Sequence, residues 1–291
     1  MSGTGSTPAL TGHIEVRDLC IRFNARDTTV DAISGVSLNV QPGEFVSLIG
    51  PSGCGKSTLL NAVAGFIEPS RGTVLLDGQP IRGPGSDRGV VFQQYSLFPW
   101  MTVRKNVEFG LKMKGIPRSE RERQARTLLG LTGLLSFENH YPDQLSGGMK
   151  QRVGIVRALA TSPQVLLMDE PFGALDAQTR VVMQEILTNM WQRLRISVLF
   201  VTHDIDEAVF LSDRVYVMTA RPGRVKAELA VSLPRPRTSE MTGMPQFQAM
   251  VRTIKRLIRE ESLAAMGGEL TESGLVGLST EIGPQGVGRI L

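Results

Sequence analysis

Disulfide frameworks and membrane-spanning helices are the first structures that this 291-residue sequence excludes. It has only two cysteines, Cys20 and Cys54, too few for a disulfide framework, and this usage fits a reducing compartment. No segment approaches the roughly 18 consecutive apolar residues of a membrane-spanning helix. The first residues have no basic start and no apolar run, so we expect a flexible leader at 1–11 instead of a signal peptide.

A strong excess of charge of one sign is also missing. The chain has 32 Lys and Arg against 28 Asp and Glu, a net charge of +4, with loose basic clusters only at 118–126 and 252–259. A nucleic-acid-binding chain usually gathers its basic residues in a stripe, so we interpret both clusters as solvated helix faces. The length is ample for one large domain or two modest ones.

Strand and helix patterns divide the chain into three parts. Runs rich in β-branched residues predict strands at 13–16, 36–40, 45–49, 73–76, 89–92, 165–168, 198–201 and 214–218. Apolar residues at helical spacing predict helices at 57–65, 103–113, 119–131, 147–159, 178–194 and 204–211. Early strands in succession predict an antiparallel sheet, the later alternation predicts a helix-covered parallel sheet, and 94–160 forms a helical insertion.

The end of the chain has a different character. A Pro-broken linker follows Leu233, and we expect 238–291 to be an extension of the main domain at 12–237. Within this extension, 247–265 predicts an amphipathic helix, and the glycine-rich stretch at 267–291 predicts a mobile tail.

A phosphate-binding loop is the clearest chemical motif. The stretch GPSGCGKST at 50–58 fits G-x-x-x-x-G-K-[ST] and lies between a predicted strand and a predicted helix, as this motif requires. Its glycines let backbone N–H groups converge on phosphate oxygens, Lys56 supplies a positive charge, and the Ser57 hydroxyl is placed to bind Mg²⁺. A glycine-rich turn without ligand is the alternative, but it gives no reason for the Lys-Ser pair.

Four polar residues follow apolar strands of the predicted parallel sheet. Asp169 and Glu170 end the strand at 165–168, Gln93 follows GVVF, and His203 follows VLFVT. The carboxyl ends of parallel strands are where open α/β sheets bind ligands. Asp169 suits a metal ligand, and Glu170 suits a base that activates water. Each could instead be a hydrogen-bonded structural residue, but their order along one sheet favours positions facing a γ-phosphate.

A second candidate anion site begins the helix at 147–159. In LSGGMKQRVGIVRAL, Ser146 precedes Gly147 and Gly148, so backbone N–H groups are exposed where the helix dipole favours negative charge. A single nucleotide site has no evident need for both this helix N-terminus and the phosphate loop at 50–58, which lie far apart in the sequence.

Together these motifs resemble those of ABC-transporter ATP-binding subunits, and LSGG is the most specific of them. The resemblance covers about 13–237 and implies an α/β fold: a P-loop NTPase core of the RecA-like type, an N-terminal antiparallel β subdomain and an inserted helical subdomain. It implies a homodimer in which the phosphate loop of one subunit and the Ser146-Gly147-Gly148 stretch of the other enclose each ATP. This arrangement would explain why one chain has both a phosphate loop and an LSGG stretch, since each would contribute to a different ATP site.

The resemblance also assigns roles to residues. It implies adenine stacking by Phe23, communication across the dimer by Asp176, and catalysis by Glu170, Gln93 and His203. Mg²⁺ would be held by Ser57, Gln93 and Asp169. The expected ATP-binding residues are Phe23, Gly50, Pro51, Ser52, Gly53, Cys54, Gly55, Lys56, Ser57, Thr58, Ser146, Gly147, Gly148 and Asp176.

Three positions depart from the usual family pattern. Phe23 stands where many members have Tyr, Met149 replaces a common Gln, and Gly173 replaces a common Ser. None of them is an expected base or metal ligand. Met149 is expected to remove one hydrogen bond to the partner's ATP.

Two further stretches, GPGSDRGVVFQQYSLFPWMTVRKNV and LPRPR, resemble the ATP subunits of nitrate, sulfonate and taurine importers. The resemblance implies permease subunits as membrane partners, a solute-binding protein as an indirect partner, no nucleic-acid partner, and a peripheral location on the cytoplasmic face of the membrane. Phe98 and Trp100 form either a permease contact or part of the core. An ABC-type ATPase acting on nucleic acid or ribosomes, and a non-hydrolysing regulatory subunit, are the alternative functions.

Overall fold

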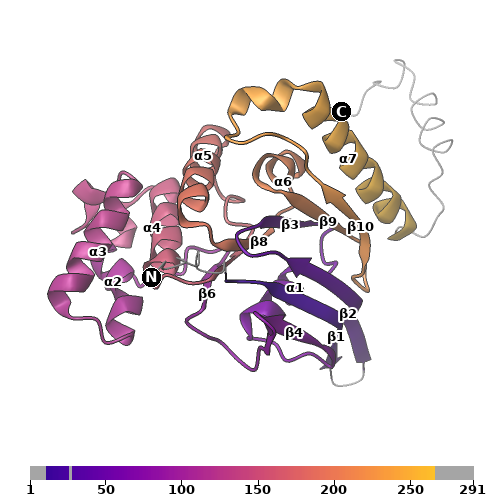
Figure 1. The fold of residues 1–291 in the computed structure, drawn as a ribbon, viewed down its shortest axis with the longest axis horizontal. Coiled ribbons are helices and arrows are strands. Elements are labelled where there is room, and N and C mark those ends of the chain that lie inside the picture. Colours follow the sequence, from indigo (N-terminus) through magenta and orange to yellow (C-terminus); the bar gives the residue numbers. More distant parts are fainter. Residues whose placement is uncertain (1–10, 26–27, 266–291) are drawn as a thin grey trace, which may run out of the picture.

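The computed structural model describes residues 11–25 and 28–265. The predicted tail at 267–291 and the predicted leader, apart from Thr11, lie outside the described residues. Figure 1 shows two sheets side by side, a lobe of helices at one end, and a long helix at the edge of the larger sheet. None of the helices in the described part of the chain is both long and apolar enough to cross a membrane.

The elements follow the predicted order closely. The strands are β1 (Ile14–Ala25), β2 (Thr28–Val40), β3 (Phe45–Ile49), β4 (Arg71–Leu76), β5 (Gln79–Pro80), β6 (Arg88–Val91), β7 (Val165–Asp169), β8 (Ser197–Val201), β9 (Arg214–Met218) and β10 (Val225–Ala230). The helices are α1 (Lys56–Ala64), α2 (Val103–Met113), α3 (Arg118–Leu131), α4 (Gly147–Ala160), α5 (Ala177–Leu194), α6 (Ile205–Leu211) and α7 (Pro245–Ala265). Three short 3-10 turns are η1 (Leu135–Phe137), η2 (Pro142–Gln144) and η3 (Ser239–Gly243).

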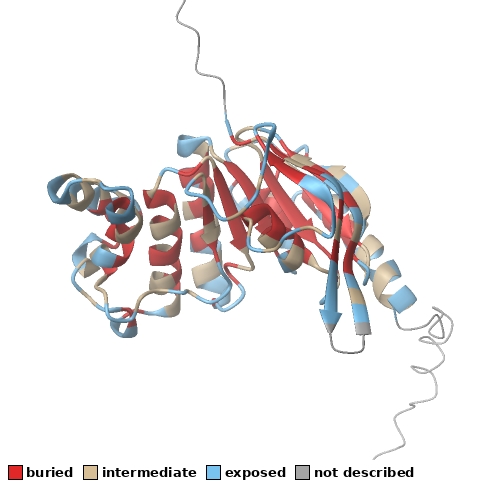
Figure 2. Ribbon diagram, turned by 90° about the horizontal axis from the view of Figure 1, so that it is seen from below, coloured by how far each residue is buried: buried red, intermediate tan, exposed pale blue. Residues whose placement is uncertain are grey.

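The larger sheet is the helix-covered parallel sheet that the sequence predicts. Its strand order is β10-β9-β3-β8-β7-β6, parallel throughout except for β10, which pairs antiparallel with β9. Strands β3 and β8 are fully buried and apolar almost throughout, because helices or the second sheet cover both of their faces. Figure 2 shows these strands buried between partly exposed outer elements. The carboxyl ends of β3, β6, β7 and β8 lie at one edge.

The predicted antiparallel sheet is also present, with the order β2-β1-β4-β5. Strands β1 and β2 are much longer than the apolar runs within them, and their pairing contains register shifts near Asp18, which has φ of +47°. A bulge of this kind bends a strand without ending it. Phe23 lies near the end of this long β1–β2 pair, where it is opposite Val30.

Helices α2, α3 and α4 form the lobe at one end of the molecule (Figure 1). Val107, Leu129 and Val153 belong to a hydrophobic core that is separate from the two cores on the faces of the larger sheet. The arginines of α3 are paired with nearby glutamates, as in Arg121–Glu108 at 3.2 Å. This pairing agrees with the interpretation of cluster 118–126 as a solvated helix face.

Helix α7 begins two residues before the predicted helix at 247–265 and packs on the larger sheet. Phe247, Val251 and Ile254 are buried in the same core as β9 and α6. The linker before α7 is fixed by Arg237, whose guanidinium donates hydrogen bonds to backbone carbonyls at the end of α6. Burial lowers the pKa of Arg237 to about 10.

Candidate functional site

The phosphate loop joins β3 to α1 and has the backbone that its glycines predict. Gly53 and Gly55 have φ of +72° and +100°, and a Cβ on Gly55 would lie 2.6 Å from Ile33 Cδ1. Lys56, the first residue of α1, donates hydrogen bonds from Nζ to the carbonyls of Gly50 at 2.9 Å and Pro51 at 3.0 Å. The backbone of the loop therefore surrounds the ammonium group of Lys56.

This loop forms one wall of a hollow of about 400 Å³. The hollow is lined by Phe23, Val30, Ala32, Ser52, Gly53, Gly55, Lys56, Ser57, Thr58, Glu170 and Arg221. Phe23 comes from β1 of the antiparallel sheet and is 45% exposed, so its ring is available to a ligand. The fold thus brings Phe23 and the phosphate loop together, and it adds Arg221, which our sequence analysis missed.

The remaining loop residues lie behind this wall. The Cys54 side chain is fully buried in the core, so its thiol does not face the hollow, and burial raises its pKa. Gly50 lies against Met218 of β9, where an added Cβ would be 3.0 Å from the Met218 carbonyl oxygen. Gly50, Pro51 and Cys54 therefore support the loop through its backbone.

Oxygen atoms suited to a magnesium ion lie next to the loop. Ser57 donates a hydrogen bond from Oγ to Asp169 Oδ1 at 2.9 Å, which links α1 to the end of β7. Burial raises the pKa of Asp169, and the Ser57 hydrogen bond opposes this shift. Hydroxyl, carboxylate and amide oxygens, here from Ser57, Asp169 and Gln93, are the ligand type that Mg²⁺ prefers, so this donor set fits the ion.

The three candidate catalytic residues meet at the carboxyl edge of the sheet. Glu170 Oε2 lies 3.1 Å from His203 Nδ1 and 3.4 Å from Gln93 Nε2. The Glu170 backbone has φ of +44°, an unusual conformation for a non-glycine residue, and its N–H donates to the Val201 carbonyl at 2.9 Å. Strained backbone at a carboxylate that faces a ligand pocket is typical of an active site.

The LSGG stretch lies outside the hollow. Ser146 caps α4 and accepts a hydrogen bond from the Met149 N–H at 3.3 Å. A Cβ on Gly148 would lie 2.4 Å from Thr179 Cγ2, so a larger residue at the start of α4 would have to displace the Thr179 side chain at the start of α5. Neither Ser146, Gly147 nor Gly148 lines the hollow.

Asp176 belongs to the same outer group. It caps α5, and its carboxylate accepts hydrogen bonds from the N–H and hydroxyl of Thr179 at 2.9 and 2.7 Å. The bond from the Thr179 backbone lowers the pKa of Asp176, which keeps the cap negatively charged. The site residues thus form two groups, one around Lys56 and one around Ser146.

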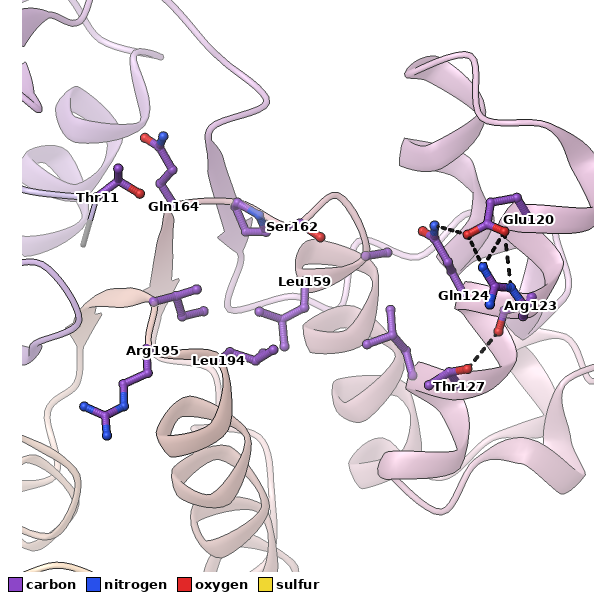
Figure 3. Close-up of a pocket in the computed structure, with 14 residues that line it drawn as sticks. Thr11, Glu120, Arg123, Gln124, Thr127, Leu159, Ser162, Gln164, Leu194 and Arg195 are labelled. Atoms are coloured by element: carbon purple, nitrogen blue, oxygen red, sulfur yellow. Dashed lines mark hydrogen bonds and ion pairs between the residues drawn. The ribbon is translucent and has the colours of Figure 1, made fainter. Parts of the chain in front are cut away.

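A different hollow, of about 750 Å³, lies between the helical lobe and the larger sheet and contains none of the predicted site residues. Figure 3 shows that Glu120, Arg123 and Gln124 of α3 form hydrogen bonds among themselves at its edge. Its inner wall is largely apolar, with Leu159 and Leu194. The polar groups suited to binding a ligand lie around Lys56 and not in this larger hollow.

Two aromatic side chains stand out on the helical lobe. Trp100 is 69% exposed, which rejects a core role for it, and its ring lies 5.6 Å from the half-buried ring of Phe98. The turn that carries them is held by buried Asn106, which accepts from the Phe98 N–H at 2.9 Å and donates to the Met101 carbonyl at 3.1 Å. Such a fixed, exposed aromatic turn is typical of a contact surface.

Comparison with known proteins identifies the family. The family profile described as ABC transporter matches residues 33–173. The nitrate import ATP-binding protein NrtD of Synechocystis is 50% identical over 253 residues, 85% of this chain and 95% of the relative. This chain belongs to the ABC transporter family. The taurine import ATP-binding protein TauB of Rhizobium johnstonii is 48% identical over 252 residues, 84% of this chain and 96% of the relative.

Solved structures agree with this assignment. The dimeric ABC transporter cassette MJ0796 has a TM-score of 0.69 at 35% identity and covers 76% of this chain and 100% of its own. The same cassette in a post-hydrolysis state, bound to ADP and Pi, has a TM-score of 0.66 at 33% identity. The predicted α/β P-loop NTPase fold, ATP as ligand and ABC-type ATPase activity are therefore confirmed. The roles of individual residues stay predictions.

Proposed function

We propose that this ABC ATPase powers an importer for a small anionic or zwitterionic solute, and that it works as a homodimer with two composite ATP sites. One observation carries the composite site: Ser146, Gly147 and Gly148 present a helix N-terminus, yet they do not line the hollow around Lys56. In the dimer, the hollow of one copy would receive the start of α4 from the other. Each ATP would then be bound from both sides.

Within each composite site, the residues of one chain have separable tasks. Phe23 stacks on the base, Lys56 and the loop amides bind the phosphates, and Glu170 accepts a proton from the attacking water. His203 and Gln93 orient Glu170, because both lie within hydrogen-bond reach of the same carboxylate oxygen. Ser57, Asp169 and Gln93 would hold Mg²⁺, which would supply positive charge to offset the negative charge of the transferred phosphoryl group.

ATP acts as the switch because it binds the closed dimer more strongly than the open one. Hydrolysis removes the phosphate that both copies contact, and the dimer opens. Asp176 would sense this change across the dimer, and its hydrogen bond to Thr179, which lies against Gly148 at the start of α4, supports this role.

The proposed partners follow from the exposed turn and from the relatives. The Phe98–Trp100 surface suits a helix of a membrane-embedded permease, so we place the ATPase on the cytoplasmic face of the membrane. The nitrate and taurine names of NrtD and TauB suggest the solute class, and a solute-binding protein would act indirectly. Residues 12–237 would form the ATP-binding domain with a helical subdomain at 94–160. Nothing favours the nucleic-acid alternative.

Gel filtration of paired variants tests the composite site. Glu170→Gln preserves the size and shape of the side chain but removes the base. A stable dimer should therefore accumulate in the presence of ATP, while the rate of hydrolysis falls about 10²- to 10⁴-fold. Adding Ser146→Tyr to this variant should abolish the dimer but leave ATP binding by the monomer unchanged. If Ser146→Tyr weakens ATP binding to the monomer, Ser146 belongs to its own chain's site and the proposal is wrong.

Reconstitution tests the importer. The ATPase is co-purified with its permease, and hydrolysis in liposomes is measured with nitrate, taurine or a sulfonate and the solute-binding protein. Solute-dependent stimulation is expected. Strong, salt-sensitive retention of DNA or RNA in a filter-binding assay, without such stimulation, would favour the nucleic-acid alternative.

A further inference from the structure

The turn at 219–224, which joins β9 to β10, contacts the phosphate loop although no motif marks it. The Arg221 guanidinium donates hydrogen bonds from Nε and Nη2 to the carbonyl of Gly53 at 3.3 and 3.2 Å. Arg221 also lines the same hollow as Lys56 and Ser57. Because a peptide bond is planar, holding the Gly53 carbonyl also fixes the orientation of the Cys54 N–H.

Gly223 brings the turn close to the loop from a second direction. A Cβ on Gly223 would lie 2.1 Å from the Cys54 carbonyl oxygen, so only glycine fits here. Its N–H donates to the Ala32 carbonyl at 2.9 Å, and its carbonyl accepts from the Ser34 N–H at 3.0 Å. The turn therefore lies between the phosphate loop and β2, where Ala32 also lines the hollow.

The far side of the turn is held by α7. The Ala220 N–H donates to Glu261 Oε2 at 3.0 Å, and Glu261 Oε1 lies 2.8 Å from Lys226 Nζ on β10. Lys226 also pairs with Glu260 at 2.9 Å. Figure 1 shows α7 running beside β9 and β10 toward this turn. The last turns of α7 are thus connected to the phosphate loop through Glu261, Ala220, Arg221 and Gly53.

We propose that Arg221 is a positioning residue for the phosphate loop and that α7, through Glu261, holds Arg221 in place. Helix α7 thereby sets the affinity of its own chain for nucleotide. Arg221 acts on the loop backbone, so its loss weakens ATP and ADP alike and leaves the chemical step at Glu170 intact. This inference rests on the ATP site proposed above.

Nucleotide binding to two matched arginine variants tests the first step. Arg221→Ala should raise the Kd of both ATP and ADP about three- to tenfold, the cost of a lost hydrogen bond to a charged group at an exposed site, with kcat within about twofold of wild type. Arg221→Lys, which keeps a charged donor, should recover most of this loss. The control is Arg224→Ala in the same turn, since the Arg224 side chain has no hydrogen bond or ion pair among the described residues.

Three results would overturn this step. An equal rise in Kd for Arg224→Ala would show a general effect of charge. A rise for ATP alone would show that Arg221 binds the γ-phosphate directly, and an unchanged Kd would remove Arg221 from the site.

Two glutamate variants test the connection to α7. Glu261→Ala and Glu260→Ala each remove an ion pair with Lys226, but only Glu261→Ala removes the acceptor of the Ala220 N–H. Glu261→Ala alone should raise the Kd, by about two- to fivefold, and the double variant with Arg221→Ala should be no weaker than Arg221→Ala. Equal effects of the two glutamate variants, or additive effects in the double variant, would refute the connection.

Lys56→Ala separates this inference from the function on which it rests. It should abolish ATP binding. If Lys56→Ala binds ATP normally, the nucleotide site itself is misassigned; if it does not, an unchanged Kd in Arg221→Ala refutes only the positioning role.

Discussion

Glu207 is a buried carboxyl group close in sequence to His203, the proposed catalytic histidine, and its environment makes a pH-dependent stability measurable. It lies on α6, which begins two residues after His203, and it is only 4% exposed. The Thr202 hydroxyl and the Gln184 amide, the latter at 3.1 Å, donate hydrogen bonds to its two oxygens. Burial, the largest cause, raises the pKa of Glu207 from 4.5 to about 6.

The charged groups that face Glu207 act in opposite directions. Asp204 raises the pKa, and Arg180, which pairs with Asp204 at 3.2 Å, lowers it. Because the folded state holds the proton more tightly than the unfolded state, folding is favoured while Glu207 is protonated. Stability from this group is complete below pH 4.5 and is lost as the pH rises to about 6. The loss corresponds to about 2 kcal/mol.

Replacing Glu207 with Gln should remove this loss, because a neutral amide cannot ionise. At pH 4 the variant should match the wild type in free energy of unfolding. At pH 7.5 it should be about 2 kcal/mol more stable, or about 4 to 8 °C higher in Tm. Urea unfolding followed by tryptophan fluorescence measures both, since Trp191 is in the same core as α6.

Glu240→Gln, at an exposed site on η3, is the control for losing one carboxylate. The reasoning is refuted if Glu207→Gln and the wild type differ in free energy of unfolding by the same amount at both pH values. It is also refuted if the wild type becomes more stable relative to the variant as the pH rises.

Three further predictions concern the site and its partners. Ser57→Ala should raise the Mg²⁺ concentration for half-maximal ATPase activity about tenfold, and an unchanged Mg²⁺ titration would remove Ser57 as a ligand. Gly223→Ala should lower the ATP affinity more than about tenfold, because its Cβ would lie 2.1 Å from the Cys54 carbonyl oxygen; normal affinity in calorimetry would contradict the close packing. Trp100→Ser should keep the ATPase activity of the free subunit but lose stimulation by the permease, and full stimulation would exclude this surface as the contact.

Most of the fold was predictable because its central strands are short, apolar and buried. The predicted ranges of β3, β9 and α2 match the structure residue for residue. Strand β10 was missed because it is an edge strand, without a buried alternation, whose residues are half-buried or exposed. The full length of β1 was missed because a bulge at Asp18 interrupts the apolar pattern.

The candidate site was predictable where its chemistry is local in the sequence. The phosphate loop and the residues at strand ends each carry a motif, and the structure brings Gln93, Glu170 and His203 together. Arg221 has no motif, since a turn residue between two strands looks like any exposed arginine. Its contact with Gly53 joins residues 168 positions apart, and only the pairing of β9 with β3 brings them together.

Helix α4 is shared between two of the three hydrophobic cores found among residues 11–25 and 28–265. Val153 and Val156 pack in the core of the helical lobe, whereas Ile155 and Leu159 pack in the core of the larger sheet. A tilt of the lobe relative to the sheet therefore has to rotate or slide α4, and Ser146 at its tip moves with it. In the proposed dimer, a permease that pushes on the lobe would change the alignment of the half-site presented to the neighbouring copy. The transported solute would then govern nucleotide turnover without any contact with the nucleotide.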